Sequence, residues 1–217
     1  MKAVILAAGY GTRLYPKTLN IPKAFLEYND KKIIDYLIDD LKDCGIDEVI
    51  IVTNNKFYND FTKYERNNVK IINDGSNCNE DRKGAVSDLI LGINLIDDDV
   101  IVLASDSLLD FSFKLFIDFF HKINYSSIMY YKEYDLDKLK NTGQCVIESK
   151  RVIRFIEKPK DAISNNAVPP FYIFKKNDLK YIRKCDKYDS LGKVIESLYK
   201  DTNVYAYKMP GKRIDIS

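Results

Sequence analysis

The sequence has few of the residues that build metal centres, disulfide frameworks or histidine-based active sites. Its 217 residues include four cysteines and one histidine. Cys44, Cys78, Cys145 and Cys185 are far apart, and no pair has the CxxC spacing of a zinc site or a thioredoxin-like motif. His121 sits in an apolar helical pattern with no partner nearby that would make it a base, so we interpret it as structural. This cysteine usage predicts a reduced, cytoplasmic protein.

Long apolar runs and an excess of charge of one sign are also absent. The first apolar run stops at Gly9, short of the roughly 7 to 15 residues of a secretory h-region. No segment approaches the roughly 18 apolar residues of a membrane helix. Lys plus Arg total 34 and Asp plus Glu total 32, a net charge of +2. Duplex nucleic-acid binders usually show a basic excess. We therefore expect neither a membrane nor a nucleic-acid partner.

Strand and helix patterns alternate through the first part of the chain. Hydrophobic residues make up 46%, enough for a sizeable core. Buried-strand patterns cover residues 2–7, 47–53, 69–72 and 99–105, and helical patterns cover 32–43, 56–64, 85–96 and 112–122. This order predicts an α/β fold of Rossmann-like type, with a mixed, mostly parallel sheet flanked by helices. Residues 1–217 are expected to form a single domain.

After about residue 125 the pattern becomes richer in short strands. These are expected at 126–132, 144–150, 151–157 and 169–175, with helices at 177–184 and 189–199 and a strand, turn and strand over 204–216. The second and third of these strands read as a hairpin. The C-terminal half is therefore predicted to be more β-rich and mixed or antiparallel.

The segment "LAAGYGTRLYPKTLNIPK", residues 6–23, follows the first strand and allows four interpretations. A dinucleotide fingerprint would need a third glycine where Leu14 stands, and an acid where the second strand ends in Thr53, Asn54 and Asn55. A Walker-type loop lacks its G-x-x-x-x-G-K pattern. A plain strand-to-helix turn is the third reading.

A phosphate-binding loop of another kind accounts for more of these residues. Gly9 and Gly11 let backbone N–H groups approach a phosphate without an obstructing Cβ. Arg13 can form forked hydrogen bonds to phosphate oxygens, and Pro22 fixes the backbone before a second cation, Lys23. This arrangement is suited to holding several negative charges in a row.

The same segment resembles the signature of the sugar-1-phosphate nucleotidylyltransferases, the nucleoside-diphosphate-sugar pyrophosphorylases that include glucose-1-phosphate thymidylyltransferases. That signature is G-x-G-T-R-L-x-P-x-T followed by P-K. Four further segments resemble the family in order: "KKIIDYLIDDL", "VLASDSLLD", "IRFIEKP" and "GKRIDI". The resemblance implies a nucleotide-binding half at 1–124 and a sugar-phosphate-binding half at 125–217.

The resemblance also implies a reaction and a role for each matching residue. A nucleoside triphosphate and a sugar 1-phosphate, a hexose by expectation, give an NDP-sugar and pyrophosphate, with Mg²⁺ as cofactor. The implied catalytic residues are Arg13, Lys23 and Asp106, and the implied metal ligands are Asp106 and Asp215. Nucleotide binding falls to Leu6, Ala8, Gly9, Gly11, Thr12, Asn79 and Gly84, and sugar-phosphate binding to Gly143, Glu157 and Lys158. The resemblance allows a homo-oligomer.

Base choice and substrate leave alternatives open. The loop at 73–84 offers Asn77 or Asn79 and the Gly84 amide to a base, which favours dTTP or UTP over CTP; otherwise this loop only caps the next helix. Asp106 could be a helix cap, and Glu157 with Lys158 a solvated pair. A cytidylyltransferase acting on a non-sugar phosphate such as phosphocholine is a rival function. A non-catalytic nucleotide-sugar sensor is another.

Overall fold

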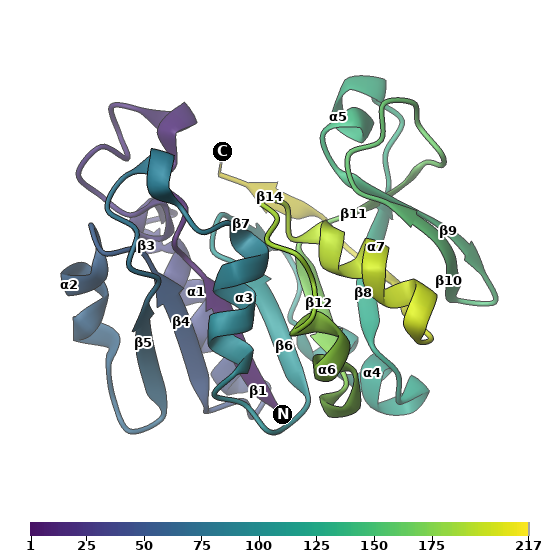
Figure 1. Cartoon of the computed structure of the whole chain (residues 1–217), viewed down its shortest axis with the longest axis horizontal. Coiled ribbons are helices and arrows are strands. Elements are labelled where there is room, and N and C mark those ends of the chain that lie inside the picture. Colours follow the sequence, from purple (N-terminus) through teal and green to yellow (C-terminus); the bar gives the residue numbers. More distant parts are fainter. Residues whose placement is uncertain (217) are drawn as a thin grey trace.

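The fold is built on one ten-stranded sheet, seen in the computed structural model of Figure 1, which describes residues 1–216. The strand order is β11-β9-β10-β13-β8-β12-β6-β1-β4-β5. The four strands at one end are parallel: β1 (Lys2–Leu6), β4 (Val49–Thr53), β5 (Val69–Asn73) and β6 (Val100–Ala104). The predicted α/β class and mostly parallel flanked sheet are confirmed for this part.

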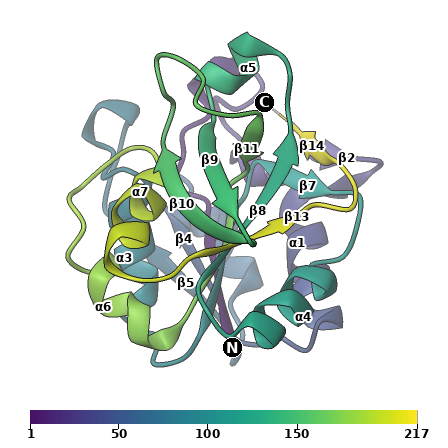
Figure 2. The same ribbon diagram turned by 90° about the vertical axis from the view of Figure 1, so that its right-hand side faces the viewer.

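The strands of the second half extend the same sheet beyond β6. They are β8 (Ser127–Lys132), β9 (Gly143–Glu148), β10 (Arg151–Ile156), β11 (Asn166–Val168), β12 (Phe171–Phe174) and β13 (Tyr205–Lys208). β12 runs antiparallel to β6, with Ile173 opposite Ile101. β9 and β10 form the expected hairpin, which belongs to this sheet and lies beside β11 in Figure 2.

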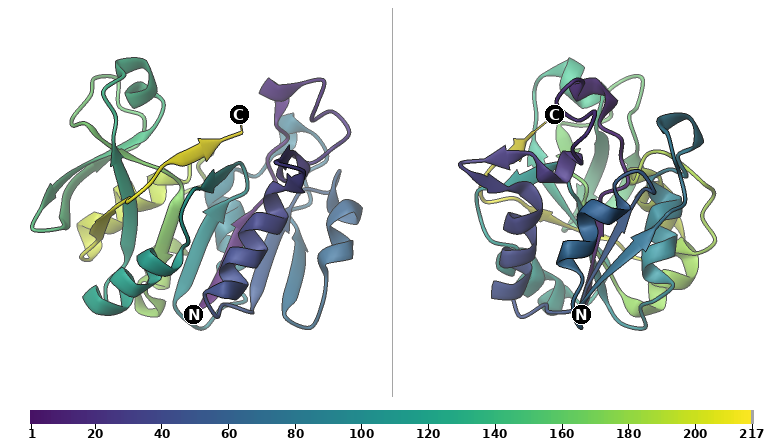
Figure 3. Two further views of the ribbon diagram at one scale, coloured as in Figure 1. Left: turned by 180° about the vertical axis from the view of Figure 1, so that it is seen from behind. Right: turned by 90° about the vertical axis from the view of Figure 1, so that its left-hand side faces the viewer.

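Helices cover both faces of the parallel strands. α1 (Ile33–Asp43), α2 (Tyr58–Phe61) and α4 (Lys114–Ile123) pack on one face, seen from behind in Figure 3. α3 (Ala85–Ile93), α6 (Leu179–Ile182) and α7 (Gly192–Asp201) pack on the other. Successive residues of β1 serve opposite layers: Ile5 packs with the first group and Val4 with the second. Burial on both faces explains why these strands read as continuous apolar runs.

Several short elements depart from the sequence expectations. The structure adds β2 (Glu27–Tyr28), β3 (Lys31–Lys32), β7 (Ser107–Leu109), α5 (Leu136–Lys140) and β11. Helix 56–64 is shorter than expected and ends in a 3-10 turn, η3 (Thr62–Tyr64), and helix 85–96 ends at Ile93. The last strand is β14 (Arg213–Asp215). The added elements are too short to show a periodic apolar pattern in the sequence. Their secondary structure therefore depends on tertiary contacts.

The remaining 3-10 turns lie in loops: η1 (Thr12–Leu14), η2 (Lys23–Phe25), η4 (Asn79–Asp81) and η5 (Lys176–Asp178). The loops after β1 and β5 lie at the carboxyl edge of the parallel strands, and β14 returns to the same edge (Figure 1). Open α/β sheets bind ligands at this edge. No helix within residues 1–216 combines the length and apolar character needed to cross a membrane.

Candidate active site

The glycine loop after β1 is held in shape from both sides. Gly11 adopts a left-handed φ of 63°, and a Cβ there would lie 3.2 Å from Thr18, whose Oγ1 donates to the Gly11 carbonyl at 2.7 Å. Asn54 Nδ2 donates to the Ala8 carbonyl at 2.9 Å. A Cβ at Gly9 would meet open space, so this side of the loop is open to a ligand.

Leu6, Thr12 and Arg13 lie on or beside this loop, whereas Asn79 and Gly84 lie in the loop before α3. Leu6 ends β1, and Thr12 and Arg13 stand exposed on η1. Within residues 1–216, Arg13 forms no ion pair. Its guanidinium is therefore available to an anionic ligand, although the structure does not bring it into the carboxylate cluster described next.

Lys23 and Asp106 meet at this edge from different parts of the chain. Lys23 begins η2, Asp106 joins β6 to β7, and Nζ lies 3.2 Å from Asp106 Oδ2. Burial opposes the charge of the Asp106 carboxylate, but Lys23 and Arg213 outweigh this effect and lower the pKa of Asp106. Asp106 is therefore an ionised carboxylate rather than a proton donor at neutral pH.

Asp215 joins this pair through the two-stranded ladder of β7 and β14. Asp215 lies opposite Ser107, and the Ile216 amide donates to the Asp106 carbonyl. Arg213 links the parts: Nε donates to Ser107 Oγ at 2.8 Å, and Nη2 donates to Asp215 Oδ2 at 2.8 Å. Ser107 Oγ in turn donates to Asp106 Oδ1 at 3.0 Å. The two carboxylates thus belong to one connected network.

The donor set of this network fits Mg²⁺. Asp106 from the turn before β7 and Asp215 from β14 offer hard carboxylate oxygens, and Mg²⁺ commonly binds through one or two carboxylates plus phosphates and waters. No group of three or more His, Cys, Asp and Glu side chains suited to a metal occurs in residues 1–216. An all-protein metal cage is therefore not present in that part of the chain, whereas a shared site with a phosphate ligand is compatible with it.

The loop before α3 is packed against the loop before α7. Gly84 has φ of 88°, and a Cβ there would lie 2.8 Å from the Tyr188 carbonyl, which accepts from the Val86 amide. Arg82 forms an ion pair with Asp189 across the same contact and donates to the Asn79 carbonyl. Because the Gly84 position tolerates no side chain, this glycine has a packing role in addition to the one expected from the sequence.

The expected sugar side is organised around Glu157. A Cβ at Gly143 would lie 2.7 Å from Glu157 Oε2, and a Cβ at Gly192 would overlap the same carboxylate. Ser190 Oγ donates to Glu157 Oε1. Burial raises the pKa of Glu157, although the Ser190 hydroxyl and the charges of Lys158 and Lys193 oppose the rise. The pairing with Ser190 and the two flanking glycines argue against a merely solvated Glu157–Lys158 pair.

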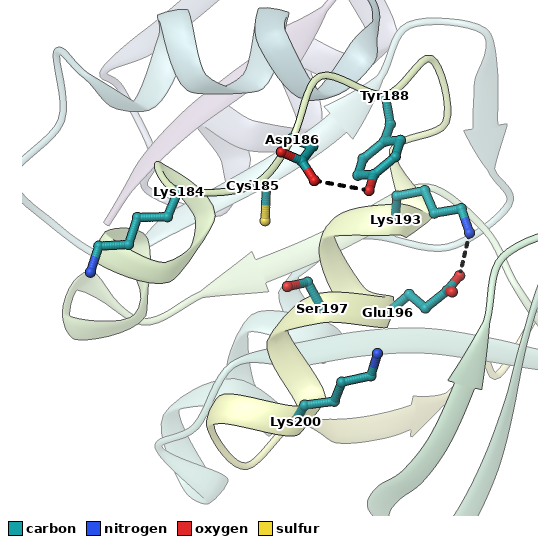
Figure 4. A pocket seen from close by; sticks show the side chains of 8 residues that line it. All are labelled: Lys184, Cys185, Asp186, Tyr188, Lys193, Glu196, Ser197 and Lys200. Carbon is teal, nitrogen blue, oxygen red and sulfur yellow. Dashed lines mark hydrogen bonds and ion pairs between the residues drawn. The ribbon is translucent and has the colours of Figure 1, made fainter.

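Helix α7 also contacts the backbone of Glu157. Glu196 Oε2 accepts from the Glu157 amide at 2.9 Å and pairs with Lys193 Nζ at 2.9 Å. Figure 4 shows the ion pair between Lys193 and Glu196 on this helix, which also carries Ser197 and Lys200. Lys158 is exposed, with φ of 48°, so its side chain points from a strained turn toward solvent.

Sequence reasoning missed several residues of the site: Ser107, Ser190, Gly192, Glu196 and Arg213. Ser107 and Arg213 adjoin or lie close to predicted aspartates, and that proximity is the only signal they carried. Gly192 gave none, because it reads as an ordinary residue at the start of a helix. Contacts between segments more than 30 residues apart define the roles of all five.

Comparisons with known proteins agree with this geometry. The "Nucleotidyl transferase" family profile matches residues 2–214. Mannose-1-phosphate guanylyltransferase 1 of Arabidopsis thaliana is 32% identical over 241 residues, covering 100% of this chain but 61% of the relative. Choline-phosphate cytidylyltransferase of Streptococcus pneumoniae is 56% identical over 52 residues, 24% of this chain and 23% of that protein.

A solved structure shows the same fold. It is a putative glucose-1-phosphate thymidylyltransferase from Bacillus anthracis in complex with a sucrose, with a TM-score of 0.85 and 21% identity over 99% of this chain and 89% of that one. The present chain spans less than two thirds of the length of the plant guanylyltransferase. With the profile covering nearly every residue, the chain belongs to the nucleotidyl transferase family.

Proposed function

We propose that this protein joins a nucleoside triphosphate to a sugar 1-phosphate, giving an NDP-sugar and pyrophosphate. The observation that carries this proposal is the network of Lys23, Asp106 and Asp215 beside the open glycine loop. Membership of the nucleotidyl transferase family supports it. The network provides a cation and two carboxylates at the sheet edge where this fold class binds ligands.

In the proposed reaction, a phosphate oxygen of the sugar 1-phosphate attacks the α-phosphorus in line and the bond to pyrophosphate breaks. Gly9 and Gly11 hold the nucleotide through backbone N–H groups. Arg13, exposed on η1, binds the β- and γ-phosphates and stabilises the leaving group. Lys23 neutralises charge that builds on the α-phosphate.

Asp106 and Asp215 would hold Mg²⁺, which when bound supplies positive charge to the phosphates. The lowered pKa of Asp106 keeps this ligand ionised. Arg213 orients Asp215 and, through Ser107, Asp106. Orientation by such outer partners is a general requirement of metal sites.

On the acceptor side, Glu157 accepts hydrogen bonds from a sugar hydroxyl while Ser190 fixes its carboxylate. Gly143 and Gly192 leave room beside that carboxylate which any side chain would fill. Lys158 binds the sugar phosphate, and the exposed position of this lysine suits a group that must reach an incoming anion.

Two nucleotide choices are open to experiment. The loop at 73–84 favours dTTP or UTP through Asn79 and the Gly84 amide, whereas the plant relative that spans this whole chain is named a guanylyltransferase of mannose 1-phosphate. We therefore take GTP with mannose 1-phosphate and dTTP or UTP with glucose 1-phosphate as the pairs to compare first.

A second candidate is a cytidylyltransferase that activates a non-sugar phosphate. The local identity of 56% to a choline-phosphate cytidylyltransferase favours it. The half-buried Glu157 with its two flanking glycines favours a sugar hydroxyl partner instead. The two functions differ in the acceptor, so one assay separates them.

The test is pyrophosphate release with Mg²⁺, scanning five nucleoside triphosphates against hexose 1-phosphates, phosphocholine and other phosphomonoesters. Release with a sugar 1-phosphate supports the proposal and identifies both substrates. Release only with CTP and a non-sugar phosphate would establish the second candidate. Tight nucleotide binding without release from any pair would contradict both and favour a sensor.

A further inference from the structure

Asp88 is a buried carboxyl group that has no role in the proposed reaction. Asp88 lies in the first turn of α3 with 7% of its surface exposed, and Asp74, just after β5, is 8% exposed. Asp74 is close enough to Asp88 for its charge and its hydrogen bonding to favour the protonated form of Asp88. Two ionised carboxylates share a buried site only at a high cost, which favours a proton on one of them.

The hydrogen bonds identify which carboxyl holds it. Asp74 is an acceptor: Oδ1 receives the Ser76 amide at 2.7 Å, and both oxygens lie within 2.9 Å of Ser76 Oγ. Asp88 Oδ1, by contrast, is buried and has no hydrogen-bond partner among residues 1–216. A proton on Asp88, donated to Asp74, makes this side chain a hydrogen-bond donor and relieves the repulsion.

The same network reaches the glycine loop. Ser76 Oγ lies 3.1 Å from the hydroxyl of Tyr10, the residue between the two glycines. Because the one hydroxyl proton of Ser76 points to Asp74, the Tyr10 hydroxyl donates to Ser76. A directed chain of donors therefore runs from Tyr10 through Ser76 to Asp74, and Asp88 donates to the same acceptor from α3.

The charges that face Asp88 come from two other segments. Asp74 faces it from the end of β5, and Asp189 faces it from the loop before α7, where Arg82 pairs with Asp189. Tyr10 faces Asp74 from the loop after β1. Burial first, then the charge and hydrogen bond of Asp74 and the charge of Asp189, raise the pKa of Asp88 to about 7.

We propose that Asp88 is a positioning residue whose protonated form donates to Asp74 and so fixes the glycine loop against the loop that leads into α3. Both loops belong to the nucleotide side, and the inference rests on the proposed function. When Asp88 loses its proton, a second negative charge faces Asp74. The Asp74–Ser76–Tyr10 connection then loosens, and the affinity for nucleotide falls near neutral pH.

The first experiment measures KM and kcat for the nucleotide from pH 6 to 8.5 in wild type and in Asp88→Asn. The Asn amide donates to Asp74 at every pH, and the ratio of the two proteins cancels titration of the nucleotide itself. We expect the KM ratio of wild type to variant to rise on the order of fivefold across this range, with little change in the kcat ratio. Asp43→Asn, an exposed carboxylate on α1, should follow wild type.

Two further variants separate positioning from simple loss of folding. Asp88→Leu keeps the volume but cannot donate, so its KM should be high at every pH, and Tyr10→Phe should abolish the pH-dependent rise by cutting the chain at its other end. A circular dichroism spectrum confirms that each variant folds. A constant KM ratio, or a pH-dependent rise that survives in Tyr10→Phe, would overturn the proposal.

A readout without turnover keeps this inference distinct from the proposed function. Infrared difference spectra between wild type and Asp88→Asn should show a protonated carboxyl band at pH 6 that is lost by pH 8.5. Amide hydrogen exchange at residues 9–13 should become faster in wild type than in the variant over the same range. If pyrophosphate release fails but both signals appear, the proposed function is wrong and the positioning role of Asp88 is supported. If neither signal appears, the positioning role of Asp88 is wrong, whether or not the protein releases pyrophosphate.

Discussion

Lys23 Nζ lies 3.2 Å from Asp106 Oδ2, so a cation and an ionised carboxylate that are 83 residues apart in the chain share the edge of the sheet. The carboxylate keeps its charge because Lys23 and Arg213 offset the cost of burial. The ion pair leaves Lys23 accessible to a ligand, because 17% of the Lys23 side chain is exposed. A phosphate entering beside it can therefore share the cation.

Lys23→Ala should lower kcat on the order of 100-fold or more, because charge building on the α-phosphate would lose its cation. The fold should persist, since Lys23 contributes one partly exposed ion pair. Steady-state pyrophosphate release and thermal unfolding are the two measurements.

Lys42→Ala is the matched control, an exposed lysine in the last turn of α1. It should retain wild-type rates. Equal rates for wild type and Lys23→Ala would remove Lys23 from the catalytic group.

Arg213→Ala should raise the Mg²⁺ concentration for half-maximal rate about tenfold, because Asp215 and Ser107 would lose the side chain that orients them. The rate at saturating Mg²⁺ should fall less. Initial rates over a Mg²⁺ series provide the measurement.

Lys212→Ala removes the same charge from the neighbouring exposed position, where the hydrogen bonds of Lys212 within residues 1–216 come from its backbone alone. It should leave the Mg²⁺ curve in place. If the two variants shift the curve equally, the effect is one of net charge and not of orientation.

The stability of the wild-type protein should fall relative to Asp88→Asn as the pH rises. The folded-state pKa of Asp88, about 7, lies above its ordinary value of 3.8, so the folded state holds a proton that the unfolded chain releases. That contribution is complete at low pH and is lost as the pH rises through about 7. Between pH 5 and 8 the free energy of unfolding should fall by roughly 2 kcal/mol relative to the variant.

Urea unfolding at a series of pH values measures this difference. Asp43→Asn should run parallel to wild type, because that carboxylate is exposed. Parallel curves for wild type and Asp88→Asn would mean that Asp88 is ionised throughout.

The sequence allowed prediction of the features that depend on local pattern. The parallel strands are apolar on both faces, and the glycine loop and Asp106 follow strands directly, so their shared edge could be inferred. The ladder of β7 and β14 could not, because strands of three residues have no period to read. Asp88 was equally hidden, since an acid in the first turn of a helix is usually a favourable exposed partner of the helix dipole.

Gly192→Ala should damage the acceptor side while leaving nucleotide binding intact. A Cβ at this position would overlap the half-buried Glu157 carboxylate, which also accepts a hydrogen bond from Ser190. Alanine is the better helix former, so the helix itself should not suffer. We expect KM for the sugar phosphate to rise about tenfold, with the nucleotide KM nearly unchanged, because the displaced carboxylate no longer meets its hydroxyl partner.

A double variant distinguishes this mechanism from general disturbance of α7. If Gly192→Ala acts by displacing Glu157, it should add little to the effect of Glu157→Ala, where there is no carboxylate to displace. Initial rates of the two single variants and the double variant complete the cycle. Fully additive losses would show that the glycine acts through another contact, and the acceptor pocket would then have to be assigned without Glu157 at its centre.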